Sequence, residues 1–191
     1  MQSPLNKFIV NFDSAYMDEA PTQSGIKLYR DTKFHPENYA QTNGVVSGVP
    51  RYLKDGMDIT TGDSIYFSYQ VVEDKQQRDR DTDVHKNLIF YNGSKSWLVD
   101  KDLIYFRVRN DEIKMLNGYV LVDLVQEEVK STLIIPDYLK KKTLIGQGKI
   151  IYAEDLKRGD HIFYDKRFIE VYELFGMEYY ILHKDRILAT L

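Results

Sequence analysis

The chain contains no cysteine among its 191 residues. This absence excludes disulfide bridges, thiolate catalysis and zinc sites built on cysteine, and it fits a reducing cytoplasm. No apolar run approaches the roughly 20 residues that span a bilayer. The first residues also lack the basic stretch and long apolar core of a signal peptide. We therefore expect a cytoplasmic protein with no membrane partner.

An excess of basic charge is also missing. The formal net charge is −3 and the isoelectric point is about 5.8. Proteins that bind the phosphate backbone of nucleic acids normally carry a basic surface. We therefore expect no nucleic-acid partner.

Aromatic residues, in contrast, are abundant: they make up 13% of the chain, with 15 Tyr and 9 Phe. Their broad side chains pack well on a pleated surface, which favours strands. No segment shows a long apolar period of 3.6 residues, so we expect little helix. The pattern predicts strands at residues 8–12, 44–47, 64–69, 88–91 and 103–106, and then at 119–124, 148–152, 161–164, 168–174 and 178–182.

Five short patterns of the first half recur in the same order in the second half. The offset between matched positions falls from 111 residues to about 83, as loop deletions in a second copy would produce. The sequence therefore predicts two diverged copies of one β domain, residues 1–110 and 111–191, joined through the charged segment 107–114. The matched segments are 4–10 with 115–121, 24–28 with 131–135, 43–46 with 147–150, 62–66 with 159–163, and 98–104 with 182–188.

Residues that carry chemistry do not gather into a recognisable pattern. Residues 79–83 begin like a calcium loop, but Val84 and Phe90 stand where that loop needs glycine and glutamate. The histidines are scattered, and none pairs at short spacing with another histidine or with a nucleophile. We therefore expect no catalytic site, no metal and no cofactor. The histidines are His35, His85, His161 and His183.

Two long polar connections, residues 17–42 and 127–146, each contain a short apolar island. The islands are Ile26-Lys27-Leu28 and Leu133-Ile134-Ile135-Pro136. Apolar residues inside a solvated loop pack either on their own domain or on a partner. Each island is therefore either a buried edge strand or a docking element.

At these residues the sequence resembles the GroES-like co-chaperonins, the ring-shaped lids of chaperonin folding chambers. The second copy resembles the family at its loop motif, residues 130–136, and at its Gly-Asp strand, residues 159–163. It ends on a similar Ile-Leu-Ala strand, residues 185–189. The first copy is similar at residues 24–28 and at Gly62-Asp63. Both copies have short connections where typical members carry a roof hairpin, as in phage-encoded co-chaperonins. The duplication is similar to the double-barrel chloroplast proteins.

The resemblance implies an all-β protein with two tandem GroES-like β-barrel domains. It implies a co-chaperonin that caps a GroEL-like chaperonin ring, assists ATP-dependent folding and forms a homo-oligomeric ring. The expected site is the set of docking residues on the two islands, in the host cytoplasm if the chain is phage-encoded. Lys27 and Thr132 depart from the family pattern. The docking residues are Leu133, Ile134, Ile135, Ile26 and Leu28.

Three other functions are weighed against this one. A phage or bacterial structural protein could reuse the barrel as an assembly module. A dehydrogenase with a GroES-like domain would need a nucleotide-binding half and zinc-ligating cysteines, which this sequence lacks. An oligonucleotide-binding barrel is disfavoured by the acidic charge balance and by the lack of an aromatic and basic strand face.

Overall fold

The computed structural model describes residues 2–3, 6–16, 19–20, 28–29, 40–53, 57–73, 86–124, 145–174 and 177–191. The chain forms two compact units, Met1–Ile113 and Lys114–Leu191. Both are built almost entirely from strands, and the single α-helix in the described residues has four residues. The all-β fold class predicted from the sequence is confirmed.

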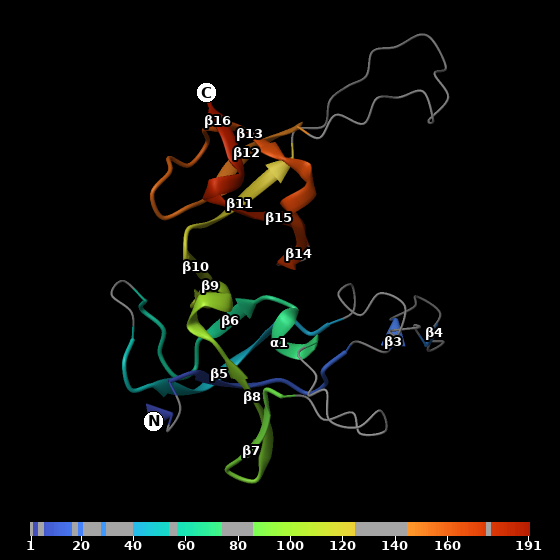
Figure 1. Ribbon diagram of the computed structural model, residues 1–191, viewed down its shortest axis with the longest axis vertical. Helices are drawn as coiled ribbons and strands as arrows, with labels where there is room; N and C mark the ends of the chain where they lie inside the picture. The colour runs from blue at the N-terminus through green and yellow to red at the C-terminus, as the bar shows by residue number, and fades with distance from the viewer. Residues whose placement is uncertain are drawn as a thin grey trace. The chain divides into compact units, whose positions relative to one another are not determined.

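The first unit is organised around an eight-stranded sheet (Figure 1). Its strand order is β10-β9-β6-β5-β2-β8-β7, and β1 pairs in parallel with the end of β5. A short helix, α1 (Gln70–Glu73), follows β6, and β3 (Glu19–Ala20) and β4 (Leu28–Tyr29) form a separate pair. The bounds are β1 (Gln2–Ser3), β2 (Phe8–Asn11), β5 (Asn43–Pro50), β6 (Ser64–Phe67), β7 (Leu88–Tyr91), β8 (Ser94–Val99), β9 (Ile104–Arg109) and β10 (Glu112–Met115).

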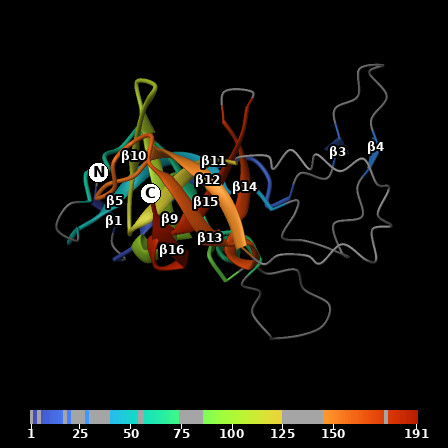
Figure 2. The same ribbon diagram turned by 90° about the horizontal axis from the view of Figure 1, so that it is seen from above.

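The second unit contains a six-stranded sheet with the order β14-β15-β11-β12-β13-β16 (Figure 2). Short 3-10 helices, η4 (Lys166–Phe168) and η5 (Lys184–Arg186), follow β13 and precede β16. The bounds are β11 (Tyr119–Leu124), β12 (Ile145–Tyr152), β13 (His161–Asp165), β14 (Glu170–Leu174), β15 (Met177–His183) and β16 (Ile187–Thr190).

The two sheets have the same topology. Read from one edge, β7-β8-β2-β5-β6-β9 matches β14-β15-β11-β12-β13-β16, and the chain visits the strands in the same order in both units. A register shift interrupts β2–β5 at Ile9/Val10 and β11–β12 at Leu121/Val122. A 3-10 helix precedes the last strand of each set, η2 (Lys101–Leu103) and η5. The duplication read from the sequence therefore has a structural counterpart.

The strand registers define which positions are equivalent. Val10 is equivalent to Val122, because each follows the register shift. Val46 pairs with Val10 and Ile150 pairs with Val122, so Val46 is equivalent to Ile150. Asp100 is equivalent to His183, since each caps the 3-10 helix before the last strand. Two of the sequence matches are thus displaced by one residue, those at 4–10 and at 98–104. The matches at 43–46 and 62–66 agree with the registers.

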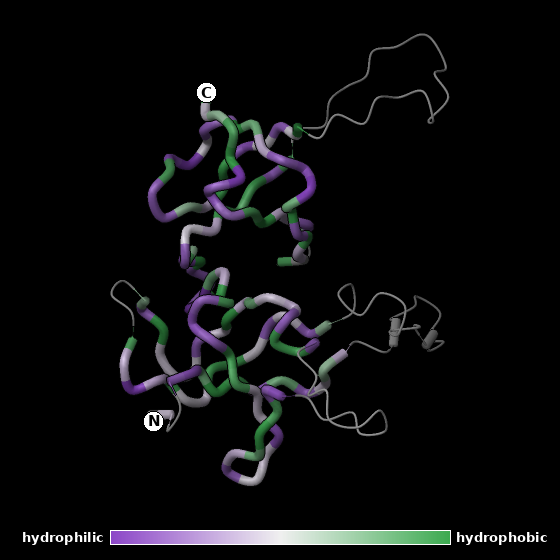
Figure 3. The backbone as a smooth tube through the Cα atoms, viewed as in Figure 1, coloured by the Kyte–Doolittle hydropathy of each residue, from purple (hydrophilic) through white to green (hydrophobic). Residues whose placement is uncertain are grey.

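Each unit has its own apolar core. In the first, Phe8, Phe67 and Phe106 are fully buried, and Phe12 stacks on Trp97 with ring centroids 4.8 Å apart. In the second, Val122 and Ile150 are fully buried in a cluster that also contains Tyr164. Burial of each such side chain contributes roughly 1.5–3 kcal/mol. Hydrophobic stretches follow the strands in Figure 3, and polar residues gather in the turns.

Segment 107–114, expected to be a charged connection, is a β-hairpin instead. Arg107 and Arg109 lie in β9, and β10 begins at Glu112. Asn110 and Asp111 between them both have positive φ, 49° and 63°, as a tight two-residue hairpin turn requires. Strands β1, β3, β4, β8, β10 and β16 are additional to the ten that the pattern predicted.

Candidate functional site

The two apolar islands lie on equivalent connections of the two units. Residues 12–42 join β2 to β5, and residues 125–144 join β11 to β12. Ile26, Leu133, Ile134 and Ile135 lie outside the described residues. Leu28 is the first residue of β4, whose backbone pairs with Ala20 of β3 and is not part of the eight-stranded sheet. The docking role of these five residues stays a prediction.

Glycines let the strands at the base of each connection approach closely. A Cβ atom on Gly44 would lie 2.7 Å from Val10 Cγ1 and 2.8 Å from the Asn11 carbonyl oxygen. At the equivalent Gly148 a Cβ atom would lie 3.1 Å from the Asp123 carbonyl oxygen. Asn11 is further held by Ser96, whose hydroxyl donates to Asn11 Oδ1 over 2.8 Å. The sheets therefore fix the two ends of each island-bearing connection.

The Gly-Asp pairs form the same turn in both units. Gly62 and Gly159 have φ of 97° and 95°, which favours glycine. The Gly62 N–H donates to the Val46 carbonyl, and the Gly159 N–H donates to the Ile150 carbonyl, each over 2.8 Å. The sequence motif thus marks a hydrogen-bonded entry into β6 and β13.

Among the described residues, only the first unit has an arginine cluster at this turn. Asp63, which is 3% exposed, accepts from Arg109 Nε over 2.7 Å and from Arg109 Nη2 over 2.8 Å. The Thr60 N–H donates to the same carboxylate over 2.8 Å. Arg107, which is 4% exposed, pairs with Asp58 over 3.1 Å, and its Nε and Nη1 have no hydrogen-bond partner among the described residues.

These contacts set the ionisation of the cluster. Burial opposes ionisation of Asp63, but hydrogen bonds from Arg109 and the Thr60 N–H outweigh it and lower the pKa of Asp63 below its ordinary 3.8. Burial also opposes ionisation of Asp58, but the charges of Arg109 and Arg107 and hydrogen bonds from both side chains outweigh it and lower the pKa of Asp58. The hydrogen bond to Asp63 raises the pKa of Arg109. The pairing of Arg109 with Asp63 and Asp58 therefore keeps these groups charged, an arrangement suited to holding the turn in place.

Sequence reasoning missed this cluster. Each of its ion pairs joins residues 46 or more positions apart, and the pairing of β6 with β9 brings them together. The alternation of Arg107 and Arg109 on one strand was the available signal. No group of three or more His, Asp or Glu side chains in the described part of the chain is placed to hold a metal ion. No helix among those residues is long and apolar enough to cross a membrane.

Comparison with known proteins places the second unit in a family. Residues 112–191 match the model of the chaperonin 10 Kd subunit. A co-chaperonin GroES of Syntrophotalea carbinolica is 30% identical over 92 aligned residues, which cover 97% of that protein and 41% of this chain. The chain belongs to the chaperonin 10 family. The GroES-like resemblance read from the sequence is thereby confirmed.

The chaperonin 10 match begins at the first residue of β10 and contains the whole six-stranded sheet. Residues 1–111 lie outside it, but their sheet shares its strand order with the matched unit. The connection between β11 and β12, which carries Leu133, Ile134 and Ile135, lies inside the matched region. We therefore interpret the islands by comparison with the chaperonin 10 family.

Proposed function

We propose that this chain is a co-chaperonin with two tandem chaperonin 10 domains, residues 1–110 and 111–191. The observation that carries the proposal is the shared strand order, combined with the family match of the second unit. It puts both apolar islands on the same connection of the same topology. The proposed partner is a GroEL-like chaperonin in the cytoplasm. The ATP that drives folding is hydrolysed by that partner, and this chain contributes binding.

In this proposal the second island is the main docking element. Leu133, Ile134 and Ile135 form an uninterrupted aliphatic triplet, whereas Lys27 interrupts the first island. Burying one such aliphatic side chain in a groove contributes roughly 1.5–3 kcal/mol, and a ring of subunits repeats that gain. The charged ammonium of Lys27 has to stay in water while Ile26 and Leu28 are buried, so the first island is the auxiliary one.

The test is the variant Ile134→Asp, measured for co-purification with a chaperonin in ATP. We expect binding to be lost while the protein stays folded, because the described residues Val122, Ile150 and Tyr164 already form an apolar core in the second unit. The matched control is Lys27→Asp, which should weaken binding far less. Unfolding of Ile134→Asp would show that the triplet belongs to a core. A folded variant that binds as before would refute docking. Stable incorporation of the protein into a particle would favour the structural or assembly protein instead.

The proposed ring uses strand pairing that one chain already shows once. In the first unit's sheet, the short strand β10 lies on the outer edge of β9, the last strand of the matched set. β16, the equivalent of β9, is at the edge of its own sheet and exposes 57% of Leu188. We propose that the first residues of another copy cover β16 as β10 covers β9. An uncovered edge strand otherwise invites uncontrolled pairing.

A further inference from the structure

Each unit has a β-hairpin at one edge of its sheet whose outer strand is open. β7 is the last strand of the eight-stranded sheet and β14 the last strand of the six-stranded sheet, and no described strand pairs with their outer edges. In Figure 1 the β7–β8 hairpin extends beyond the other strands of its unit. An unpaired edge presents backbone donors and acceptors to another strand. The ring junction at β16 leaves both edges unused, because β10 and β16 lie at the opposite ends of the sheets.

The two hairpins are equivalent in position and in length. Trp97 of β8 and Tyr180 of β15 occupy equivalent positions, as their pairing with β2 and β11 shows. Two residues connect the strands in each hairpin. Lys95 lies opposite Phe90 in the first hairpin, and by the same count Glu178 of the second is the equivalent of Lys95.

The charges of the two hairpins are opposite. Residues 86–99 contain two lysines and no acidic residue, whereas residues 169–182 contain three glutamates and no basic residue. At the equivalent positions, Lys95 and Glu178 are both exposed, and neither forms an ion pair in the described part of the chain. Complementary charge favours a contact between unlike hairpins and disfavours one between like hairpins.

Each hairpin also exposes an apolar side chain on its open strand. Phe90 of β7 is 76% exposed, and Val171 of β14 is 56% exposed. Val171 lies opposite Tyr180, and Phe90 lies two residues from the partner of Trp97, so both project from equivalent faces of their sheets. The two side chains therefore meet on one face when β7 lies along β14.

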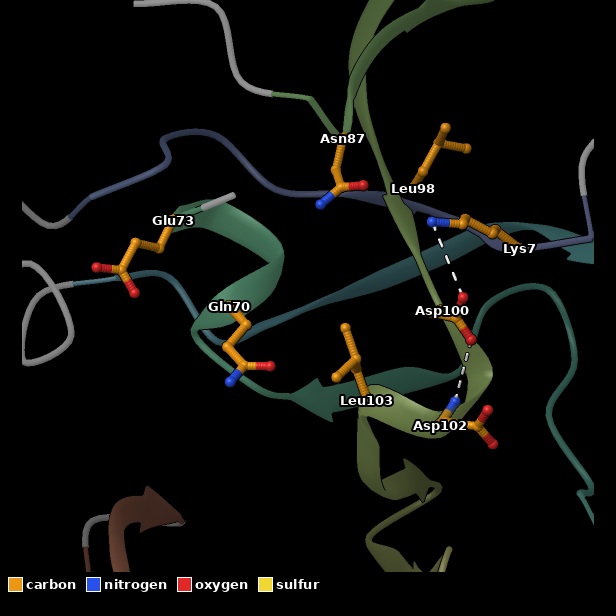
Figure 4. Close-up of a pocket in the computed structure, with 8 residues that line it drawn as sticks. All are labelled: Lys7, Gln70, Glu73, Asn87, Leu98, Asp100, Asp102 and Leu103. Carbon is orange, nitrogen blue, oxygen red and sulfur yellow. Dashed lines mark hydrogen bonds and ion pairs between the residues drawn. The ribbon is translucent and has the colours of Figure 1, made fainter. Parts of the chain in front are cut away.

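The base of the first hairpin is fixed to its own unit. Asn87, which is 7% exposed, donates from Nδ2 to the Val71 carbonyl over 2.9 Å, and its own carbonyl accepts from the Leu98 N–H over 2.8 Å. Figure 4 shows Asn87 and Leu98 at this base, beside α1. Phe90 and Lys95 lie further toward the turn. The open edge is thus held in place before a partner arrives, which reduces the entropy cost of pairing.

We propose that β7 of one copy pairs along its outer edge with β14 of a second copy of this chain, with Phe90 beside Val171. The partner is a second copy because the chain itself carries the hairpin of complementary charge. The contact joins unlike surfaces, so its repetition forms a closed ring or a filament. A two-fold contact of β7 with β7, or of β14 with β14, brings like charges together. The inference does not depend on docking to a chaperonin.

The test uses introduced thiols, since the chain has no cysteine of its own. Full chains with Phe90→Cys are mixed with full chains with Val171→Cys and treated with a short bifunctional thiol reagent. The linked dimer is measured on a denaturing gel. We expect it in the mixture and only in traces from either chain alone. The matched control replaces the second chain with Ile145→Cys, a side chain of similar exposure, 51%, on β12, and should also give only traces.

Charge reversal tests the complementarity of the same contact. Lys95→Glu in the Phe90→Cys chain, or Glu178→Lys in the Val171→Cys chain, should lower the yield of linked dimer about fivefold or more. The two reversals together should restore it. Lys149→Glu in the Phe90→Cys chain reverses an exposed lysine outside both hairpins and should leave the yield unchanged.

Several outcomes would overturn the proposal. These are a yield from the mixture no higher than from the control pair, equal losses from Lys95→Glu and Lys149→Glu, and a combined reversal that does not restore the yield. A link that forms only inside a chain carrying both thiols would show that the hairpins pair within one molecule and would exclude a second copy as the partner. Far-ultraviolet circular dichroism checks that each variant is folded.

Discussion

The pairing of Asp63 with Arg109 should dominate the local stability of the first unit. In Asp63→Asn the carboxylate becomes an amide, which keeps one acceptor for the Thr60 N–H but turns an NH₂ group toward the guanidinium. Two charge-assisted hydrogen bonds, of 2.7 and 2.8 Å, are lost or weakened. Such bonds contribute about 1.5–3 kcal/mol each, and the 31% exposure of Arg109 reduces the charge contribution. We expect the free energy of unfolding to fall by about 2–4 kcal/mol.

The chain offers a selective reporter for this measurement. Its single tryptophan, Trp97, is buried in the first unit, so fluorescence during urea unfolding follows that unit. The matched control is Asp160→Asn at the equivalent turn, where the described residues provide no ion pair for the side chain. A Tyr180→Trp reporter, at the position equivalent to Trp97, follows the second unit. The control should change stability by no more than about 0.5 kcal/mol.

The effect should also depend on pH in a defined direction. Because the pKa of Asp63 is lowered in the folded state, its contribution is present above the ordinary pKa of 3.8 and is lost as the pH falls through the lower folded value. The difference between the original protein and Asp63→Asn should therefore shrink as the pH falls from 5 toward 2. Equal destabilisation by both Asn variants at pH 7, or a difference that persists undiminished at low pH, would refute the reasoning.

Three further predictions concern other parts of the chain. Gly44→Ala should lower the free energy of unfolding of the first unit by about 1–3 kcal/mol, because its Cβ atom would overlap Val10 and the Asn11 carbonyl. Gly148→Ala should destabilise the second unit less. Urea unfolding measures both variants, and the reverse order would contradict the packing. Hydrogen bonds from the side chain and backbone N–H of Arg167 lower the pKa of Asp165 to about 2. In Arg167→Gln, the carboxyl resonance of Asp165 should show its pKa rising toward the ordinary 3.8, and an unchanged pKa would exclude the pairing of the two side chains. Deletion of residues 1–6 should reduce the assembled mass in sedimentation if these residues cover β16 of another copy, and an unaltered mass would exclude that junction.

Short-range patterns predicted much of the fold. Alternation and turn residues located ten strands, since a strand's own residues specify a half-buried pleated surface. Strand β8 was missed because it begins with Ser94, Lys95 and Ser96, which are not typical strand formers, although Ser96 and Trp97 are buried. Its place beside β2 is decided by long-range pairing.

The one-residue error in matching the two copies has a physical origin. Matching aromatic to aromatic puts Phe8 opposite Tyr119, whereas the register makes Phe8 equivalent to Val120. A slip of one residue moves each side chain to the other face of a sheet. Burial identifies the correct register, because Phe8 and Val120 are both buried and Tyr119 is only partly so. Residue type alone does not contain that information.

The candidate sites also differ in whether the sequence could predict them. The islands could be proposed from sequence because each is a contiguous run of apolar residues. The arginine cluster could not, because it joins residues from distant segments that only strand pairing brings together, such as Asp63 with Arg109. Beyond the alternation of Arg107 and Arg109 along β9, the spacing of residues in the sequence carries no signal for the cluster.

Two units of one topology in a single chain have an evolutionary consequence. In a ring of identical single-domain subunits, each substitution appears at every position around the ring. Here a substitution in one unit leaves its counterpart unchanged, so the two can specialise separately. Leu103 and Arg186 already differ in this way at equivalent positions, as do Asp100 and His183. A ring assembled from this chain would have alternating properties, with one kind of domain free to change its surface while the other retains the original contacts.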